Sequence, residues 1–227
     1  MRFQSLVSHS TDSVKRMARI ETGSRRARQA AQTRREILNA ARRLFAEKGY
    51  AATSVAEIAA AAGASVQTIY DSVGSKAELV SGLNDLIDEE GGVAPLARRI
   101  PSETDPRALL DIAVSITHNI CRRCGDIIGA VYGAANAEPA LAAVRDESRR
   151  RHREGIAWLT GRLAELGAVR RDLERERAAD MIAALTDPQV VRTFVIDYGW
   201  DWDDWHDWTV DALAQLVLTD VSRTDRR

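Results

Sequence analysis

The sequence predicts an all-α fold in which a small N-terminal unit of three helices precedes a larger helical domain. Alternating runs of β-branched residues, which are typical of strands, are almost absent from the 227 residues. Helix-start signals recur along the chain instead, as serine or threonine followed three positions later by glutamate, and as aspartate–proline pairs. A chain of this length can also accommodate a small domain joined to a larger one.

Charge is distributed unevenly along the chain. Residues 1–50 hold 12 Lys and Arg against 4 Asp and Glu, although the formal net charge of the whole chain is −1. A basic segment inside a near-neutral total is typical of nucleic-acid binding, and a merely solvated basic tail is the plainer alternative. Residues 1–30 are polar, rich in Ser and Arg and without helical periodicity, so we expect a disordered basic arm, with Met17 as an alternative start to Met1.

Capping boxes mark the helix starts of the N-terminal unit. They pair Thr33 with Glu36, Ser54 with Glu57 and Ser75 with Glu78. Together with stops at glycines and a start at Ser65, they predict helices at about 33–48, 54–62, 65–72 and 75–90. We therefore expect a domain over residues 31–78, a larger domain over residues 79–221 and a tail over residues 222–227.

The stretch AAAAGASVQTIY, residues 59–70, joins two of these helices through Gly63. A short second helix with a polar outer face makes a helix-turn-helix, in which the second helix enters the major groove of DNA. Gln67 can pair with adenine, Thr68 can bond to a base or touch a thymine methyl, and Val66 can offer a methyl contact. Free N–H groups at the helix start, behind Ser65, suit a phosphate. The alternative is an αα-hairpin that binds nothing.

Residues 33–80, TRREILNAARRLFAEKGYAATSVAEIAAAAGASVQTIYDSVGSKAELV, resemble the N-terminal DNA-binding domain of the TetR family of bacterial transcriptional regulators. The resemblance implies that this part of the chain contacts DNA, and that Tyr70 and Lys76 hold phosphates. The full set implied by matching positions is Thr53, Ser65, Gln67, Thr68, Tyr70 and Lys76.

Three residues depart from the family pattern. Ser72 and Val73 stand where the family usually has an aromatic or His followed by Phe, and Asp71 stands where a neutral or basic residue is common. The smaller Val73 would cost about 1–2 kcal/mol of packing, and Asp71 near a phosphate would weaken binding. We expect arginines of the arm and the first helix to compensate by contacting the DNA backbone or minor groove: Arg25, Arg26, Arg28, Arg34 and Arg35.

Helices of the larger domain are expected after a connection at residues 91–106, at about 105–122, 125–135, 139–166, 172–186, 188–198 and 202–219. The resemblance implies an effector-binding and dimerising domain, and residues 178–218 resemble the C-terminal part of an actinobacterial-type branch of the family. In the family, the last long helix and an earlier one, here 172–186, pack with their symmetry mates as a four-helix bundle.

The tryptophan-rich segment GWDWDDWHDW, residues 199–208, raises the possibility of a platform for stacking sugars or bases. Helical spacing favours a plainer interpretation, because Trp205, Trp208, Thr209, Ala212, Leu213, Leu216 and Val217 share one face. Asp201, Asp203 and Asp204 stand where a helix N-terminus favours acids. We expect a helix of the core and dimer interface.

An effector cavity is expected among the middle helices. The candidate lining residues, chosen by their helix positions, are Thr117, His118, Cys121, Tyr132, Asn136, Trp158 and Met181. Cys121 and Cys124 with His118 leave open a thiol or metal sensor, but a closed zinc site would need a fourth ligand. We expect no metal and no cofactor.

The function predicted from these observations is a homodimeric DNA-binding regulator, most often a repressor in this family. It would bind a near-palindromic double-stranded operator and be released by an unidentified small molecule. The sequence has none of the common catalytic or nucleotide-binding motifs, so we do not expect an enzyme. With no long apolar run and two cysteines, we expect a cytoplasmic, nucleoid-associated protein without membrane contact. Asp71, Ser72 and Val73 prompt the alternative of a helical dimeric interaction protein with weakened DNA binding.

Overall fold

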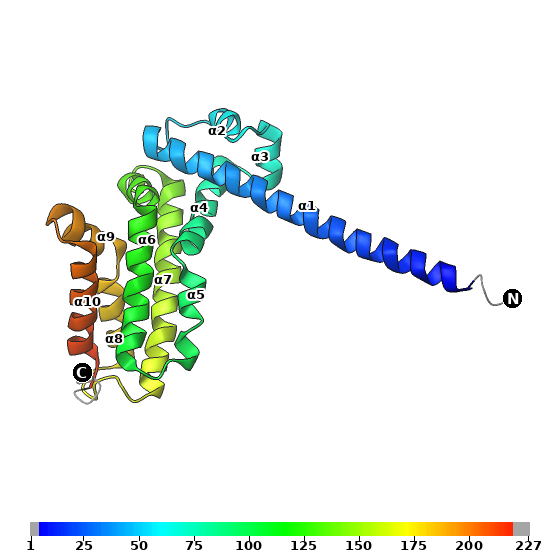
Figure 1. The fold of residues 1–227 in the computed structure, drawn as a ribbon. Coiled ribbons are helices and arrows are strands. Elements are labelled where there is room, and N and C mark those ends of the chain that lie inside the picture. Colours follow the sequence, from blue (N-terminus) through cyan, green and yellow to red (C-terminus); the bar gives the residue numbers. More distant parts are fainter. Residues whose placement is uncertain (1–4, 220–227) are drawn as a thin grey trace.

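A computed structural model describes residues 5–219, and it places the side chains from residue 25 onward except those of residues 132 and 134. Within that range the protein is helical and contains no strand, which confirms the predicted all-α class (Figure 1). The α-helices are α1 Ser5–Lys48, α2 Val55–Ala62, α3 Val66–Ser72, α4 Lys76–Glu90, α5 Val93–Ala97, α6 Pro106–Ala134, α7 Pro139–Glu165, α8 Arg175–Leu185, α9 Pro188–Arg192 and α10 Trp202–Val217. None of them is both long enough and apolar enough to span a bilayer.

Local start signals set most of these boundaries. Both serines expected to open capping boxes do so, because Ser54 and Ser75 each exchange hydrogen bonds with the glutamate three residues later. Ser65 caps α3 by accepting from the N–H of Thr68 at 3.0 Å. Asp105 and Asp187 likewise cap α6 and α9 ahead of their prolines. These predicted starts are confirmed.

The first helix differs from the expectation. A single helix α1 extends from Ser5 to Lys48, so Thr33 lies inside it rather than at a cap, and residues 5–30 are helical rather than irregular. Arginine, alanine and glutamine dominate residues 25–35, and these strong helix formers continue the helix without needing an apolar stripe. As a result α1 projects well beyond the small domain (Figure 1). Residues 1–4 and the expected tail at 222–227 lie outside the described residues.

Three other boundaries also differ. The two helices expected at 105–122 and 125–135 are one helix, α6, with a kink at Cys124, whose φ of −123° and ψ of 21° are not helical. The expected connection at 91–106 contains α5 and a 3-10 turn at Ile100–Ser102. The helix expected at 188–198 ends at Arg192 and continues as one π turn, Thr193–Asp197.

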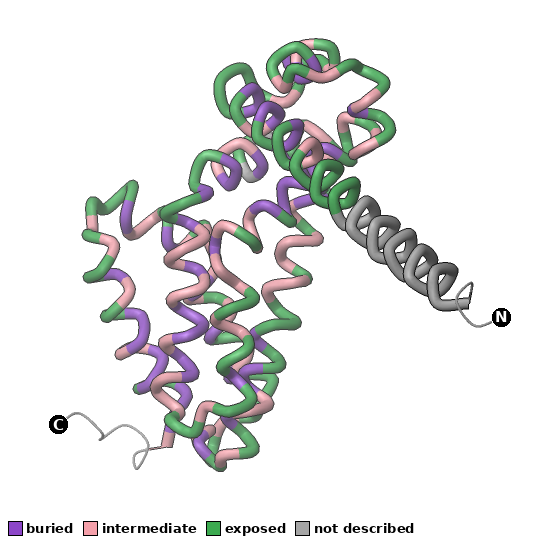
Figure 2. Tube along the Cα trace, turned by 45° about the vertical axis from the view of Figure 1, so that its right-hand side comes forward, coloured by how far each residue is buried: buried purple, intermediate pink, exposed green. Residues whose placement is uncertain are grey.

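The small domain packs α1 to α4 around one apolar cluster (Figure 2). On the inner face of α1, Ile37 and Ala41 are fully buried and share this cluster with Ile58 of α2 and Ile69 of α3. Val73 is only partly buried against this cluster, as expected for a small residue at that position. The cluster continues into the ends of α6 and α7 through residues such as Ile127 and Val144, so the two domains share a packed junction.

In the larger domain α6, α7, α8 and α10 run side by side (Figure 1). Their buried faces meet in a second cluster, which includes Leu110, Leu159, Ile182 and Trp205. The predicted inner face of α10 holds only in part. Trp205, Thr209, Leu213 and Val217 are buried, whereas Trp208 and Leu216 are exposed. The tryptophan-rich segment thus supplies both core and surface.

Candidate nucleic-acid interface and ligand cavity

The turn between α2 and α3 determines what α3 presents. Gly63 ends α2 in the left-handed region, at φ 63°, which residues other than glycine rarely adopt. Ser65 then starts α3 two residues later, and Ile69 fixes the helix by burying its side chain completely. The opposite face of α3 is therefore turned to solvent.

The predicted base-contacting residues of α3 lie on that face. Val66 and Tyr70 are 40% and 52% exposed, and the side chain of Gln67 is exposed as well. Thr68 is half-buried, and its Oγ1 lies 2.8 Å from Oγ of Ser65. Five neighbouring side chains thus form a short outward surface of the size that enters a major groove.

Asp71 engages this surface directly. The Gln67 amide donates from Nε2 to Oδ1 of Asp71 at 2.8 Å, one helical turn away. This bond uses one of the two hydrogens of the Gln67 amide and leaves the other hydrogen and the carbonyl for an adenine. Asp71 therefore places a negative charge on the outward surface of α3 and fixes the side chain of Gln67.

Lys76, at the start of α4, lies beside a residue that the sequence interpretation missed. Its Nζ is 4.1 Å from the ring centre of Tyr50 and donates to the carbonyl of Ala51 at 3.4 Å. Tyr50 packs on Phe45 with ring centres 5.4 Å apart, which anchors it to α1. The aromatic residue directly after Gly49 was the available signal. The ring and carbonyl hold the ammonium at the edge of the α3 surface.

Two residues predicted to contact DNA also have partners within the fold. Thr53 is 2% exposed, and its Oγ1 lies 2.8 Å from the carbonyl of Gly49 and 3.2 Å from that of Leu44. Arg34 donates to the carbonyl of Ser72 at 3.2 Å and lies 3.7 Å from Asp85. Thr53 is buried, so its assignment to the DNA surface is corrected. The side chain of Arg34 remains 39% exposed, and its contact with DNA stays a prediction.

Comparison with known proteins decides the family of this helical head. Residues 37–83 match the model described as bacterial regulatory proteins, tetR family. Over 195 residues the chain is 28% identical to the HTH-type transcriptional regulator TtgR of Pseudomonas putida, which covers 82% of this chain and 93% of the relative. The chain belongs to the TetR family of transcriptional regulators. DNA binding through the helix-turn-helix follows from that membership.

Solved structures with the same fold include two regulators of drug efflux. NalD, the secondary repressor of the MexAB-OprM multidrug efflux pump in Pseudomonas aeruginosa, superposes with a TM-score of 0.68 at 20% identity, covering 85% of this chain and 99% of that chain. SmeT, the repressor of the Stenotrophomonas maltophilia pump SmeDEF, gives 0.64 at 17% identity and covers 83% and 92%. The resemblance of residues 178–218 to an actinobacterial-type branch stays a prediction.

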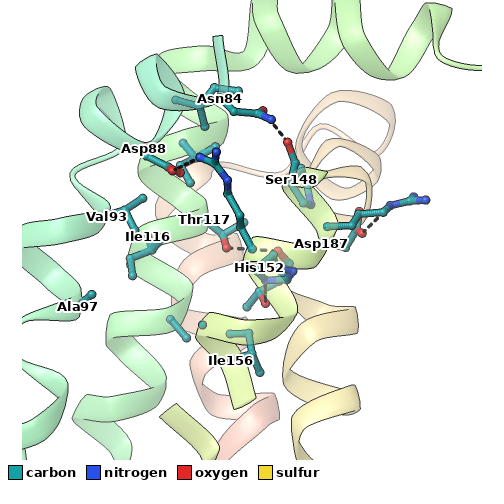
Figure 3. A pocket seen from close by; sticks show the side chains of 18 of the residues that line it. Asn84, Asp88, Val93, Ala97, Ile116, Thr117, Ser148, His152, Ile156 and Asp187 are labelled. Atoms are coloured by element: carbon teal, nitrogen blue, oxygen red, sulfur yellow. Dashed lines mark hydrogen bonds and ion pairs between the residues drawn. The ribbon is translucent and has the colours of Figure 1, made fainter. Parts of the chain in front are cut away.

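The larger domain of this TetR-family regulator contains a cavity of about 220 Å³ (Figure 3). Side chains of α4, α5, α6 and α7 and the start of α9 surround it. Most of its wall is apolar and is formed by residues such as Ile87, Val93, Ile116, Ile120, Ile156 and Leu159. A smaller number of polar side chains completes the wall, which is the usual composition of a small-molecule site.

Two of the seven residues predicted to line an effector cavity do line it, Thr117 and Trp158. His118 faces α10 instead, with its ring 5.7 Å from those of Trp202 and His206. Cys121 packs in the core, Asn136 accepts from Arg145 outside the cavity, and Met181 is exposed on α8. The side chain of Tyr132 lies outside the described residues. These four misplacements arise because helix position alone does not tell which face meets which neighbour.

The polar lining that sequence analysis missed comes mainly from α7. One face of α7 lines the cavity at helical spacing, with the polar Ser148 and His152 followed by Gly155, Ile156 and Leu159. That spacing is present in the sequence, but the arginines between Ser148 and Gly155 obscure the periodic pattern. The imidazole of His152 bonds through Nε2 to Oγ1 of Thr186 at 2.9 Å. Burial lowers the pKa of His152, so its ring is neutral near pH 7.

Charged groups at the cavity edge occur as pairs. Arg151 donates to Asp88 of α4 at 2.9 Å, and burial raises the pKa of Asp88 despite this partner. Asp187 caps α9 through the N–H of Gln189 at 2.8 Å, and it lies 4.0 Å from Arg149. The cavity therefore has no net formal charge from these four residues.

The cysteines do not have the properties of a sensor. Cys121 and Cys124 are both buried and unpaired, and burial raises the pKa of each thiol to about 12. A reactive thiol needs the opposite shift. Across the part of the chain that the structure describes, no group of three or more His, Cys, Asp or Glu is placed to hold a metal ion. The alternative of thiol or metal sensing has no support here.

The cavity and the DNA-binding head share α4. Near the cavity, Asn84 of α4 accepts from Ser148 of α7 at 2.7 Å. At the end of α4, Glu90 accepts from Arg42 of α1 at 2.7 Å, and Arg42 also binds Asp126 of α6 at 2.6 Å. One helix is thus tied by hydrogen bonds to α1, α6 and α7 together.

Proposed function

We propose that this chain is a homodimeric repressor whose affinity for its operator falls when a small molecule occupies the cavity. The observation that carries the proposal is the position of α4. This helix begins at Lys76 beside the outward surface of α3 and reaches the cavity wall with Ile87 and Asp88. Its 15 residues span about 22 Å as one rigid element.

Occupancy of the cavity would act on α4 directly. A ligand between α4 and α7 would favour an arrangement in which Asn84 and Asp88 shift away from Ser148 and Arg151. Because α4 also carries Lys76, the same shift would move the small domain. The change in DNA affinity is limited by the difference between the ligand's affinities for the two arrangements.

The dimer follows from the exposed apolar side chains of α8 and α10. Met181, Trp208 and Leu216 are all partly open to solvent on helices that the family uses for pairing. A two-fold axis through this face would place two copies of α3 about 34–36 Å apart, one turn of DNA, on a near-palindromic operator. Acting on DNA, the protein would work in the bacterial cytoplasm at the nucleoid.

The test is fluorescence anisotropy of the full chain against duplexes that tile the DNA upstream of its own gene, at two salt concentrations. Tyr70→Ala removes an exposed side chain of α3 without touching the core. Tyr198→Ala, which removes an exposed tyrosine of the larger domain, is the matched control. We expect saturable, salt-sensitive binding to one tile that Tyr70→Ala loses and Tyr198→Ala keeps.

Absence of any preference among tiles would favour the second candidate, a helical dimeric interaction protein with weakened DNA binding. The exposed Asp71 near the end of α3 is the observation that keeps this candidate open. In that case Asp71→Asn is the first reversion to test. Recovery of binding would show that the acid alone had weakened an otherwise intact head.

A further inference from the structure

Three polar side chains from three segments form one side of the cavity. Thr117 belongs to α6, His152 to α7, and Thr186 follows α8. The hydroxyl of Thr117 donates to the carbonyl of Thr186 at 3.2 Å, and the hydroxyl of Thr186 donates to the carbonyl of Ile182 at 2.7 Å. We call Thr117, His152 and Thr186 the polar floor (Figure 3).

Counting protons assigns the tautomer of His152. Thr186 has a single hydroxyl hydrogen, and the carbonyl of Ile182 takes it, so Oγ1 of Thr186 can only accept from Nε2 of His152. The proton of the neutral ring is therefore on Nε2. The other nitrogen, Nδ1, then carries a bare lone pair, and none of the described residues donates to it.

The surroundings keep this ring neutral. Desolvation opposes its protonation most strongly, Asp187 favours protonation, and Arg153 opposes it. In the neutral form the floor has no hydrogen left to give, because each of its hydrogens is already bonded to a protein oxygen. What the floor offers to a ligand is only acceptors, chiefly Nδ1 of His152 and the free lone pair of Thr117.

The rest of the cavity restricts the charge of a ligand. Asp88 and Asp187 at its edge are paired with Arg151 and Arg149, so these groups carry no net charge, and the apolar wall makes burial of a charged ligand costly. The hydroxyl of Ser148 is also occupied, since it donates to Asn84. The remaining wall is aliphatic apart from Trp158.

We propose that the cavity selects uncharged, mainly apolar molecules that carry one hydroxyl-type hydrogen-bond donor, and that Nδ1 of His152 accepts that hydrogen. This inference rests on the proposed role of the cavity as the effector site. A molecule of the same shape without the hydrogen cannot pair with Nδ1 and loses affinity, by roughly tenfold for one hydrogen bond.

The test compares three matched probes by isothermal titration calorimetry on the full chain at neutral pH. 4-Propylphenol has the donor, 4-propylanisole replaces its hydrogen with a methyl group, and 4-propylbenzoate is an anion. We expect the phenol to bind roughly tenfold more tightly than the anisole and the benzoate not to bind. Thermal melting without ligand checks that the natural chain and the His152 and Thr117 variants described next are folded.

Two substitutions assign the preference to His152. His152→Leu removes the acceptor, so the phenol should lose its advantage while the affinity for the anisole stays unchanged, which also shows that the cavity is intact. His152→Asn keeps an acceptor oxygen near the position of Nδ1 and should retain most of the advantage. Thr117→Val, which removes the second acceptor at constant shape, should reduce it less than His152→Leu.

Equal affinities of the phenol and the anisole for the natural chain would overturn the proposed ligand class while leaving the cavity as an effector site. Tighter binding of the benzoate would overturn it as well. If none of the three probes binds, the inference fails together with the effector role of the cavity. DNA binding is judged separately, by the operator tiles and Tyr70→Ala.

Discussion

Arg42 of α1 holds the carboxylate of Asp126 of α6 through two hydrogen bonds, from Nε at 2.6 Å and from Nη2 at 2.7 Å. A third bond from the same guanidinium reaches Glu90 at the end of α4. The side chain of Arg42 is only 18% exposed, so water screens these contacts weakly. One arginine of α1 thus connects the DNA-binding head to α4 and to α6 of the larger domain.

Replacing this arginine should destabilise the junction. Arg42→Met keeps the aliphatic stem but removes the cation that pairs with Glu90 and Asp126. We expect the free energy of unfolding to fall by about 1.5–3 kcal/mol, the range for hydrogen bonds to charged groups. Urea denaturation checks this, with Arg43→Met at the exposed neighbouring position as the control. Equal free energies of unfolding for the two variants would show that the contacts of Arg42 with Asp126 and Glu90 make no net contribution to stability.

Removing the acid from the α3 surface should strengthen DNA binding. Asp71→Asn eliminates a negative charge worth about 1 kcal/mol at contact distance in water, which corresponds to about fivefold in affinity. It also alters the partner that holds Gln67. Anisotropy with operator and non-operator duplexes measures the effect, and Asp204→Asn, an exposed acid of α10, is the control. Unchanged affinity would mean that Asp71 faces away from the phosphates.

The basic stretch of α1 should contribute affinity that does not depend on base sequence. Arg34 touches the carbonyl of Ser72 at the end of α3, and the exposed Arg25 and Arg26 lie two to three turns before it on the same helix. Exchanging both for glutamine should weaken binding to all duplexes alike. Each lost phosphate contact should also reduce the slope of log affinity against log salt by about 0.9. Arg98→Gln, at an exposed arginine of the larger domain, should leave the slope unchanged.

Mild acid should destabilise the folded protein through two histidines. Burial lowers the folded-state pKa of both His118 and His152 below the ordinary value of 6.5, and for His118 the neighbouring His206 adds to the effect. Between the folded and unfolded pKa values the unfolded chain binds more protons, so stability falls as pH falls below 6.5.

The free energy of unfolding cannot change by more than about 1.4 kcal/mol per pH unit for each histidine. Urea unfolding at pH values from neutral down to the mid-acid range measures it, and the variants His118→Asn and His152→Asn should each flatten the profile. If the double variant keeps the full slope, other groups are responsible for the acid sensitivity.

Sequence reasoning succeeded where the interactions are local. Ser54, Ser65 and Ser75 bond to N–H groups three residues away, and Gly63 needs only its own backbone conformation to end α2. The same reasoning failed for Thr53. Its position matched the DNA surface of the family, but its side chain is buried against the carbonyls of Leu44 and Gly49 in this chain.

The helix-turn-helix and its outward residues followed from the sequence alone, because capping, the left-handed glycine and the inward turn of Ile69 depend on neighbours within one helical turn. The cavity did not. Its polar floor joins His152 to Thr186 across 34 positions, and the Arg42 contact joins α1 to α6 across 84. Which helix faces meet over such separations is decided by how the apolar stripes pack together, and only the tertiary structure places a neutral histidine where a ligand can reach it.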